Sequence, residues 1–168
     1  MKNILLFTSV LVLGLSSMQA QNSFYIGAHA GLPISKGASD YTSFALAADL
    51  GYLFEISEDF KIGPTLGYSH TFGKDIDLGV FFAEGNDIQF MPIAAAGRYN
   101  ISDKFSVGAD VGFAIGINEE NDGGFYYSPR AAYSLSNMID AVVSYRGITG
   151  DSGNWNIISL GVEFSFDQ

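Results

Sequence analysis

Hydrophobic and polar positions alternate with a period of two along most of the chain after its first 20 residues. In 105–117, bulky or apolar residues (F, V, A, V, F, I, I) occupy every second position, and small or polar residues (S, G, D, G, A, G) lie between them. This alternation is typical of β-strands, whose successive side chains point to opposite faces. No helical stripe with a period of 3.6 residues competes with it. The pattern predicts eight strands, over 23–32, 42–56, 60–72, 87–101, 105–117, 125–135, 139–148 and 155–166.

The connections between these predicted strands alternate between short turns and long loops. Short polar turns around Glu58, Asp103 and Asn137 join the second strand to the third, the fourth to the fifth and the sixth to the seventh. The longer connections are rich in Gly, Asp, Asn and Glu, and they span 33–41, 73–86, 118–124 and 149–154. This alternation favours an up-and-down antiparallel sheet, with short turns at one end and long loops at the other.

The small and polar face of each predicted strand differs from a surface that meets water. It is dominated by Gly, Ala and Ser with single charges among them, whereas water-facing strand positions favour other polar residues and glycine weakens a strand. A narrow eight-stranded barrel suits such a face, because its interior is just wide enough for side chains to fill. We therefore predict an all-β fold: an eight-stranded antiparallel up-and-down transmembrane barrel, with its bulky face toward lipid and its polar face inside.

Charged residues on the predicted inner face are nearly balanced, with five acids and four bases. Buried charges must be paired, so this balance predicts a charge network that plugs the lumen and prevents bulk solute passage. The fourth strand conflicts with this assignment, because placing Arg98 inside also places Phe90 and Pro92 inside; a bulge or an outward tilt near Phe90 is the alternative there. The predicted lumen residues are Asp49, Glu55, Lys61, Arg98, Asp110, Arg130, Asp140, Arg146 and Glu163.

Aromatic residues gather near both ends of the predicted strands. Two girdles at the membrane interfaces would produce this distribution, and the general preference of aromatic residues for strands is the alternative explanation. The short-turn group is Phe24, Tyr52, Phe54, Phe60, Tyr99, Phe105, Tyr133, Phe164 and Phe166. The long-loop group is Tyr41, Phe44, Phe72, Phe125, Tyr127, Tyr145 and Trp155.

Residues 1–20 read as a cleaved signal peptide, with Lys2, an apolar run over 4–15 and small residues before Ala20. We expect residues 21–168 to form one barrel domain. Without Lys2, 7 basic residues stand against 18 acidic ones, a net charge of −11, which argues against binding to nucleic acid. The absence of cysteine excludes disulfides and thiolate metal sites. The mean hydropathy is nevertheless positive, at +0.20.

The last strand ends in alternating apolar residues and a final aromatic. Together with the signal peptide, the eight strands, the three short turns and the four longer loops, this ending resembles the OmpA/OmpX-type small outer-membrane β-barrels of Gram-negative bacteria. The resemblance implies a monomer in the cell outer membrane, in contact with its lipid and lipopolysaccharide. It also implies that the barrel-assembly machinery reads an assembly signal made of Leu160, Val162, Phe164 and Phe166. The chain departs from that pattern by adding two residues after Phe166.

Two histidines are the candidates for site chemistry, and they fall on opposite faces. His29 points inward and His70 outward, which argues against a shared metal site, and we expect no cofactor. His70 lies at the height at which outer-membrane lipid A deacylases, which this barrel resembles in size, carry a catalytic histidine. However, Ser69 points to the other face, and no acid on the same face as His70 can be named, so a lipid A-modifying enzyme is only an alternative.

Acidic residues dominate the predicted long loops. We therefore predict a structural or surface-interaction role through acidic extracellular loops, and not an enzyme. A weak divalent-cation contact at the tip over 119–124 is open, and so is a soluble secreted barrel that binds an apolar ligand. The loop acids singled out are Asp75, Asp77, Glu84, Glu119, Glu120 and Asp122.

Overall fold

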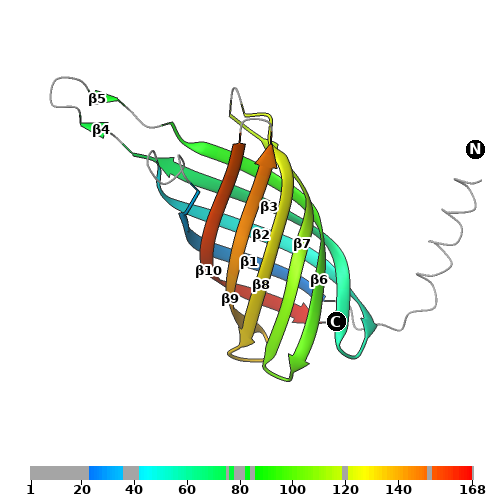
Figure 1. The fold of residues 1–168 in the computed structure, drawn as a ribbon. Coiled ribbons are helices and arrows are strands. Elements are labelled where there is room, and N and C mark those ends of the chain that lie inside the picture. The colour runs from blue at the N-terminus through cyan, green and yellow to red at the C-terminus, as the bar shows by residue number, and fades with distance from the viewer. Residues whose placement is uncertain are drawn as a thin grey trace, which may run out of the picture.

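Eight long antiparallel strands close into a barrel in the computed structural model (Figure 1). The structure describes residues 23–35, 42–74, 76–77, 82–83, 86–118, 121–150 and 153–167, and the predicted signal peptide lies outside this part. Around the barrel the order is β1-β10-β9-β8-β7-β6-β3-β2. The long strands are β1 (Ser23–Pro33), β2 (Thr42–Ser57), β3 (Phe60–Gly73), β6 (Ile88–Ser102), β7 (Phe105–Gly116), β8 (Gly124–Ser134), β9 (Ile139–Gly150) and β10 (Gly153–Asp167). The predicted fold is confirmed, and each strand begins and ends within two residues of its predicted bounds.

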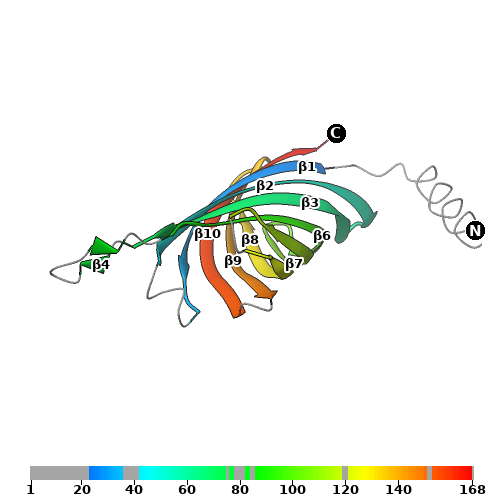
Figure 2. The same cartoon turned by 90° about the horizontal axis from the view of Figure 1, so that it is seen from above.

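One pair of elements was not predicted. The connection between β3 and β6 contains β4 (Ile76–Asp77) and β5 (Phe82–Ala83), which form a two-stranded sheet of their own. Figures 1 and 2 show this extension projecting beyond the barrel at the end that carries the long loops. Strands of two residues are too short to produce a period of two, so the sequence pattern predicts only a loop there. No helix in the described ranges is long and apolar enough to cross a membrane.

The three short turns are hydrogen-bonded to the strands beside them. The carbonyl of Asp59 accepts from the Asn100 amide at 2.8 Å, and that of Lys104 accepts from Ser134 at 2.8 Å. The carbonyl of Met138 accepts from Ser165 at 2.9 Å. Each turn therefore extends the ladder of the neighbouring hairpin, which ties the short-turn end into one rim.

Side chains on the wall follow the predicted orientation. Along β10 the outward Leu160 is 68% exposed, whereas the inward Ser159 and Glu163 are 3% and 5% exposed. The same alternation holds on the other strands, so bulky apolar side chains form a belt around the outside. This arrangement is the reverse of that in a water-soluble barrel, and it fits a wall that faces hydrocarbon.

The bulge or outward tilt that was the alternative near Phe90 in the fourth predicted strand does not occur. The β6–β7 pairing runs without a register shift from Phe90 to Asn100, so no bulge occurs near Phe90, and both Phe90 and Pro92 are buried inside. They are tolerated there because the lumen has an apolar layer on the long-loop side. This apolar layer consists of Phe90, Ala94, Ala114, Tyr126 and Ile148, with Ile88 and Trp155 packed against it.

Aromatic rings meet on the outer face near both ends of the strands. Phe24 and Phe166 have ring centroids 6.2 Å apart at the short-turn end, and Phe44 stacks on Phe72 at 4.5 Å near the long loops. The assignment of Trp155 to the long-loop girdle is wrong, because its ring packs into the apolar layer with its centroid 6.4 Å from that of Phe90. Tyr41 lies outside the described residues.

Candidate functional site in the barrel lumen

A charge pair crosses the middle of the lumen. Arg146 on β9 bonds both carboxylate oxygens of Asp49 on β2, with 3.2 Å between Nη1 and Oδ1. The two residues are 97 positions apart in the sequence and are 6% and 9% exposed. A bidentate arginine–carboxylate pair is among the strongest polar contacts that side chains form, so this pair fixes two distant strands against each other.

His29 lies against the same carboxylate. Its Nε2 is 3.1 Å from Asp49 Oδ2, although the two groups are poorly aligned for a hydrogen bond. The buried imidazole fits only because its neighbours are glycines. A Cβ at Gly161 would lie 2.2 Å from Nδ1, and one at Gly27 would lie 2.8 Å from Nε2.

The second charge pair joins Arg98 on β6 to Asp110 on β7. Arg98 Nη1 donates to Asp110 Oδ1 at 2.5 Å, and Nη2 lies 3.4 Å from the Tyr25 hydroxyl. Tyr25 in turn donates to Thr65 Oγ1 at 2.9 Å, and the Arg98 guanidinium lies 5.8 Å from the centre of the Tyr25 ring. Gly108 makes room for the arginine, since a Cβ there would be 2.8 Å from Arg98 Cδ.

The third pair joins Arg130 on β8 to Glu163 on β10 through a short hydrogen bond between Nη1 and Oε1. The three arginines of the chain are thus each bonded to an acid inside the barrel. Lys61 donates to Ser23 Oγ at 2.9 Å. The nine residues predicted for the lumen are all buried or half-buried, and Glu55, Lys61 and Asp140 are the half-buried ones.

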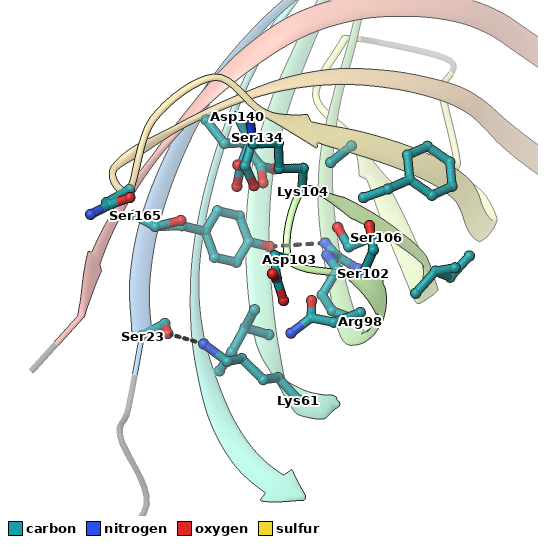
Figure 3. A pocket seen from close by; sticks show the side chains of 18 of the residues that line it. Ser23, Lys61, Arg98, Ser102, Asp103, Lys104, Ser106, Ser134, Asp140 and Ser165 are labelled. Atoms are coloured by element: carbon teal, nitrogen blue, oxygen red, sulfur yellow. Dashed lines mark hydrogen bonds between the residues drawn. The ribbon is translucent and has the colours of Figure 1, made fainter. Parts of the chain in front are cut away.

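A polar cavity opens at the short-turn end and is called the polar cup below. Its volume is about 940 Å³, and residues of all three short turns line its mouth. Tyr25, Arg98, Arg130 and Glu163 contribute to its walls farther in. Figure 3 shows the hydrogen bond between Lys61 and Ser23 in this cup. On the other side of the charge pairs lies the apolar layer around Phe90.

On the outer face, the structure gives His70 an acidic partner. His70 Nε2 is 2.9 Å from Asp87 Oδ2, and Nδ1 is 3.2 Å from the Tyr68 hydroxyl. The expectation that no acid shares a face with His70 is therefore wrong. Asp87 precedes by two residues Gln89, which pairs with His70 across the sheet, so its outward position could have been derived from strand parity. Ser69 is buried on the inner face, as predicted.

Asp87 also holds the base of the β4–β5 extension. Its Oδ1 accepts from the amide of Gly73 at 2.9 Å. The Gly73 amide, followed by the His70 ring, lowers the pKa of the Asp87 carboxyl below its ordinary value. One carboxylate thus connects the end of β3 to the start of β6.

The predicted assembly-signal residues and loop acids lie partly inside and partly outside the residues that the structure describes. Leu160, Val162, Phe164 and Phe166 point outward on β10, the strand that closes the barrel against β1. Among the loop acids, Asp122 is exposed and Asp77 belongs to β4. Four further loop acids lie outside the described residues: Asp75, Glu84, Glu119 and Glu120.

The family model of the outer membrane protein beta-barrel domain matches residues 5–166. The chain belongs to this family. Its membership identifies an integral protein of the outer membrane, with the apolar belt in lipid, the short turns on the periplasmic side and the long loops outside. No curated protein sequence matches the chain significantly.

Solved structures share the fold of this outer-membrane barrel at low sequence identity. Ail of Yersinia pestis is 15% identical, with 89% of this chain and 100% of that chain covered and a TM-score of 0.57. The N-terminal barrel domain of OprF from Pseudomonas aeruginosa is 17% identical, with 88% and 100% covered and a TM-score of 0.58. A de novo designed transmembrane β-barrel is 12% identical, with 86% and 95% covered and a TM-score of 0.54.

Proposed function

We propose that this outer-membrane barrel has a plugged lumen and acts as a rigid scaffold whose acidic extracellular loops bind partners at the cell surface. It is neither a channel nor an enzyme. The observation that carries the proposal is the filling of the lumen, where each arginine of the chain is bonded to an acid.

The plug has two parts in series. A solute entering from the periplasm meets the pairs Arg130–Glu163, Arg98–Asp110 and Arg146–Asp49, and it must break at least one of them to move on. Breaking a buried pair is costly because it leaves an uncompensated charge in a poorly hydrated site. Beyond the pairs lies the apolar layer, whose only polar side-chain groups are the Tyr126 hydroxyl and the Trp155 indole N–H, too few to replace the hydration of an ion.

The loops supply the binding function, because rigid barrels present mobile or variable loops as recognition surfaces. Ail forms a complex with the heparin analogue sucrose octasulfate, a polyanion. The loops of the present chain are acidic and would repel such a ligand. We therefore expect their partners to be cationic, either basic protein surfaces or divalent cations that bridge to lipopolysaccharide phosphates.

Biogenesis completes the proposal. We infer that cleavage after Ala20 releases a single barrel domain, residues 21–168. The outward residues of β10, from Leu160 to Phe166, are the stretch that the barrel-assembly machinery would read before this strand closes onto β1. Because the eight strands already close on themselves, the barrel needs no partner edge and is expected to be monomeric.

Planar-bilayer recording tests the plug. The purified barrel should produce no porin-like conductance steps, whereas the double variant Arg146→Ala/Asp49→Ala, which removes the central pair, should increase leakage of small ions. Stable open channels in the unmodified protein would contradict the plug.

Two further measurements test the loops and the absence of catalysis. Replacing the loop acids with their amides should reduce binding of a cationic probe such as polylysine to whole cells, and undiminished binding would contradict the loop assignment. Mass spectrometry of lipid A should show the same acylation in His70→Ala cells as in unmodified cells. A changed acylation pattern would instead favour the lipid-modifying alternative.

A further inference from the structure

The ladders on both sides of β3 are interrupted inside the barrel wall. We propose that β3 separates from β6 at its interruption and so opens a lateral path, by which apolar molecules dissolved in the membrane reach the apolar layer of the lumen. This inference goes beyond the scaffold function, because it concerns exchange between the lumen and the lipid and not binding at the loops. A path through the wall leaves the charge pairs, and with them the plug, in place.

Five of the eight ladders of the barrel pair without a break in the interior of the wall. In each of the other three, two successive pairs are missing. They are missing at 63–64 of β3 on the side of β2, at 67–68 of β3 on the side of β6, and at 128–129 of β8 on the side of β9. The register is the same before and after each gap, so these are interruptions and not bulges.

Each interruption contains one proline. Pro64 lies in β3 in the gap toward β2, Pro92 lies in β6 in the gap toward β3, and Pro129 lies in β8 in the gap toward β9. Proline has no N–H, so the strand opposite loses a donor at this point of the ladder. On its other side each proline is paired, Pro64 with Ala95, Pro92 with Ala114 and Pro129 with Ala109. In lipid no water replaces the lost hydrogen bond, so each gap is a weak point of the wall.

β3 is the strand that these gaps weaken most. Among the eight long strands it alone is interrupted on both sides, toward β2 and toward β6, which flank it in Figure 2. Both gaps fall within 63–68, and two glycines in this stretch, Gly63 and Gly67, add no side chain to hold the strand. β7, in contrast, is paired without a break to both of its neighbours in the wall. Local opening is therefore expected at the middle of β3 before it occurs at β7.

The gap between β3 and β6 has lipid on one side and the apolar layer on the other. On the outer face, Leu66 of β3 and Ile93 of β6 are 38% and 51% exposed. On the inner face, Phe90 and Ala94 of the apolar layer lie two residues before and after Pro92. Because both sides are apolar, a hydrocarbon-like molecule can cross the opened gap without losing hydration, whereas an ion cannot.

Amide hydrogen exchange of the protein in detergent micelles, followed by NMR, measures the opening. We expect the amides over 65–70 of β3 to exchange at least about tenfold faster than those over 108–113 of β7. Pro92→Ala supplies an N–H toward β3 and should slow exchange there about two- to tenfold, the effect of one hydrogen bond. Equal protection of the two segments in the unmodified protein would overturn the inference.

Thiol labelling measures access to the lumen, because the chain contains no cysteine of its own. Ala94→Cys places one thiol in the apolar layer, at a position that is 8% exposed. In lipid vesicles, N-cyclohexylmaleimide dissolves in the bilayer and should label this thiol at least about tenfold faster than a sulfonated maleimide, which must lose its hydration to enter. Adding Pro92→Ala should slow the labelling about two- to tenfold. Ile93→Cys, on the lipid face, should react at the same rate with and without Pro92→Ala.

Pro129→Ala is the matched control, because it supplies the same N–H in the gap between β8 and β9 and should leave the labelling of Ala94→Cys unchanged. Faster labelling by the sulfonated reagent would place the entrance at the aqueous ends of the barrel and overturn the inference. Slower labelling with Pro129→Ala but not with Pro92→Ala would also overturn it. Altered migration on heating in gel electrophoresis identifies the folded variants.

If Pro92→Ala does not fold, Pro64→Ala replaces it. The Pro64 ring is exposed on the lipid face, so its removal leaves the lumen unchanged and closes the other gap beside β3. Exchange on β3 should slow by the same factor, and unchanged exchange would overturn the inference. Bilayer recordings of ion conductance are independent of these outcomes, so failure here would leave the plugged scaffold untouched.

Discussion

Replacing Arg98 with alanine should strongly destabilise the barrel, because it removes one partner of a buried charge pair. Asp110 is only 6% exposed, and its Oδ1 would lose the 2.5 Å bond to Arg98 Nη1. The Tyr25 hydroxyl would lose a donor at the same time. Breaking a buried pair by removing one partner costs about 3–5 kcal/mol, and we expect Arg98→Ala to reduce the free energy of unfolding by that amount.

The reasoning predicts a different result when both partners are removed. In Arg98→Ala/Asp110→Ala no uncompensated carboxylate remains, so the loss should be smaller than the sum of the two single losses by about 0.5–3 kcal/mol. Lys104→Ala is the control: its side chain is exposed on a short turn, and the change should stay within about 0.5 kcal/mol.

Urea unfolding in lipid vesicles measures these changes through the fluorescence of Trp155, the single tryptophan of the chain. Trp155 is half-buried and packs against the apolar layer, which makes its fluorescence sensitive to opening of the barrel. Equal urea midpoints for Arg98→Ala and Lys104→Ala would refute the reasoning. Strictly additive losses in the double variant would also refute it, since they would mean that Arg98 and Asp110 stabilise the barrel independently.

Three further predictions concern other parts of the wall. Gly161→Ala should reduce the free energy of unfolding in urea by about 1–3 kcal/mol, because the added Cβ would lie 2.2 Å from the His29 ring and 2.4 Å from a backbone carbonyl oxygen. Gly97→Ala is the control and should reduce it much less, because the nearest atom to its Cβ would be 3.8 Å away. Equal losses in the two variants would contradict the packing. Leu160→Lys, at the middle of β10 on the lipid side, should cost about 2–4 kcal/mol, and a neutral effect would argue against a lipid contact there. The hydrogen bond from the Gly73 amide to Asp87 should be lost only as the pH falls through the lowered pKa of Asp87. The NMR chemical shift of the Gly73 amide should therefore titrate with a midpoint below the ordinary pKa of aspartate, and it should not titrate in Asp87→Asn. A midpoint at or above the ordinary pKa would contradict the contact.

The two faces of the barrel wall could be predicted because side chains alternate along a strand, so an odd or even count decides which face a residue joins. Whether Glu163 or Leu160 faces the lumen depends only on the count of residues along β10, which is a local property. The same count places Trp155 inside, two residues before the buried Ile157, whereas its position near the strand end alone predicts a place in the girdle. Parity could likewise have paired Asp87 with the face of His70.

The candidate site could be predicted only in part. Its charged residues follow from parity, but their partners do not. Arg146 meets Asp49 across 97 positions of sequence because the barrel closes with a particular stagger between β9 and β2. A shift of two residues in any one ladder would keep every side chain on its face and still change which acid each arginine reaches.

The sequence by itself therefore determined the all-β class, the eight strands, their two faces and the end that carries the long loops, because alternation and turn residues are written locally. Only the tertiary structure decided the pairings Arg98–Asp110, Arg130–Glu163 and Arg146–Asp49, the apolar layer above them and the polar cup below. The physical reason is closure, since distances across a lumen depend on the register of all eight ladders together, and no single strand contains that information.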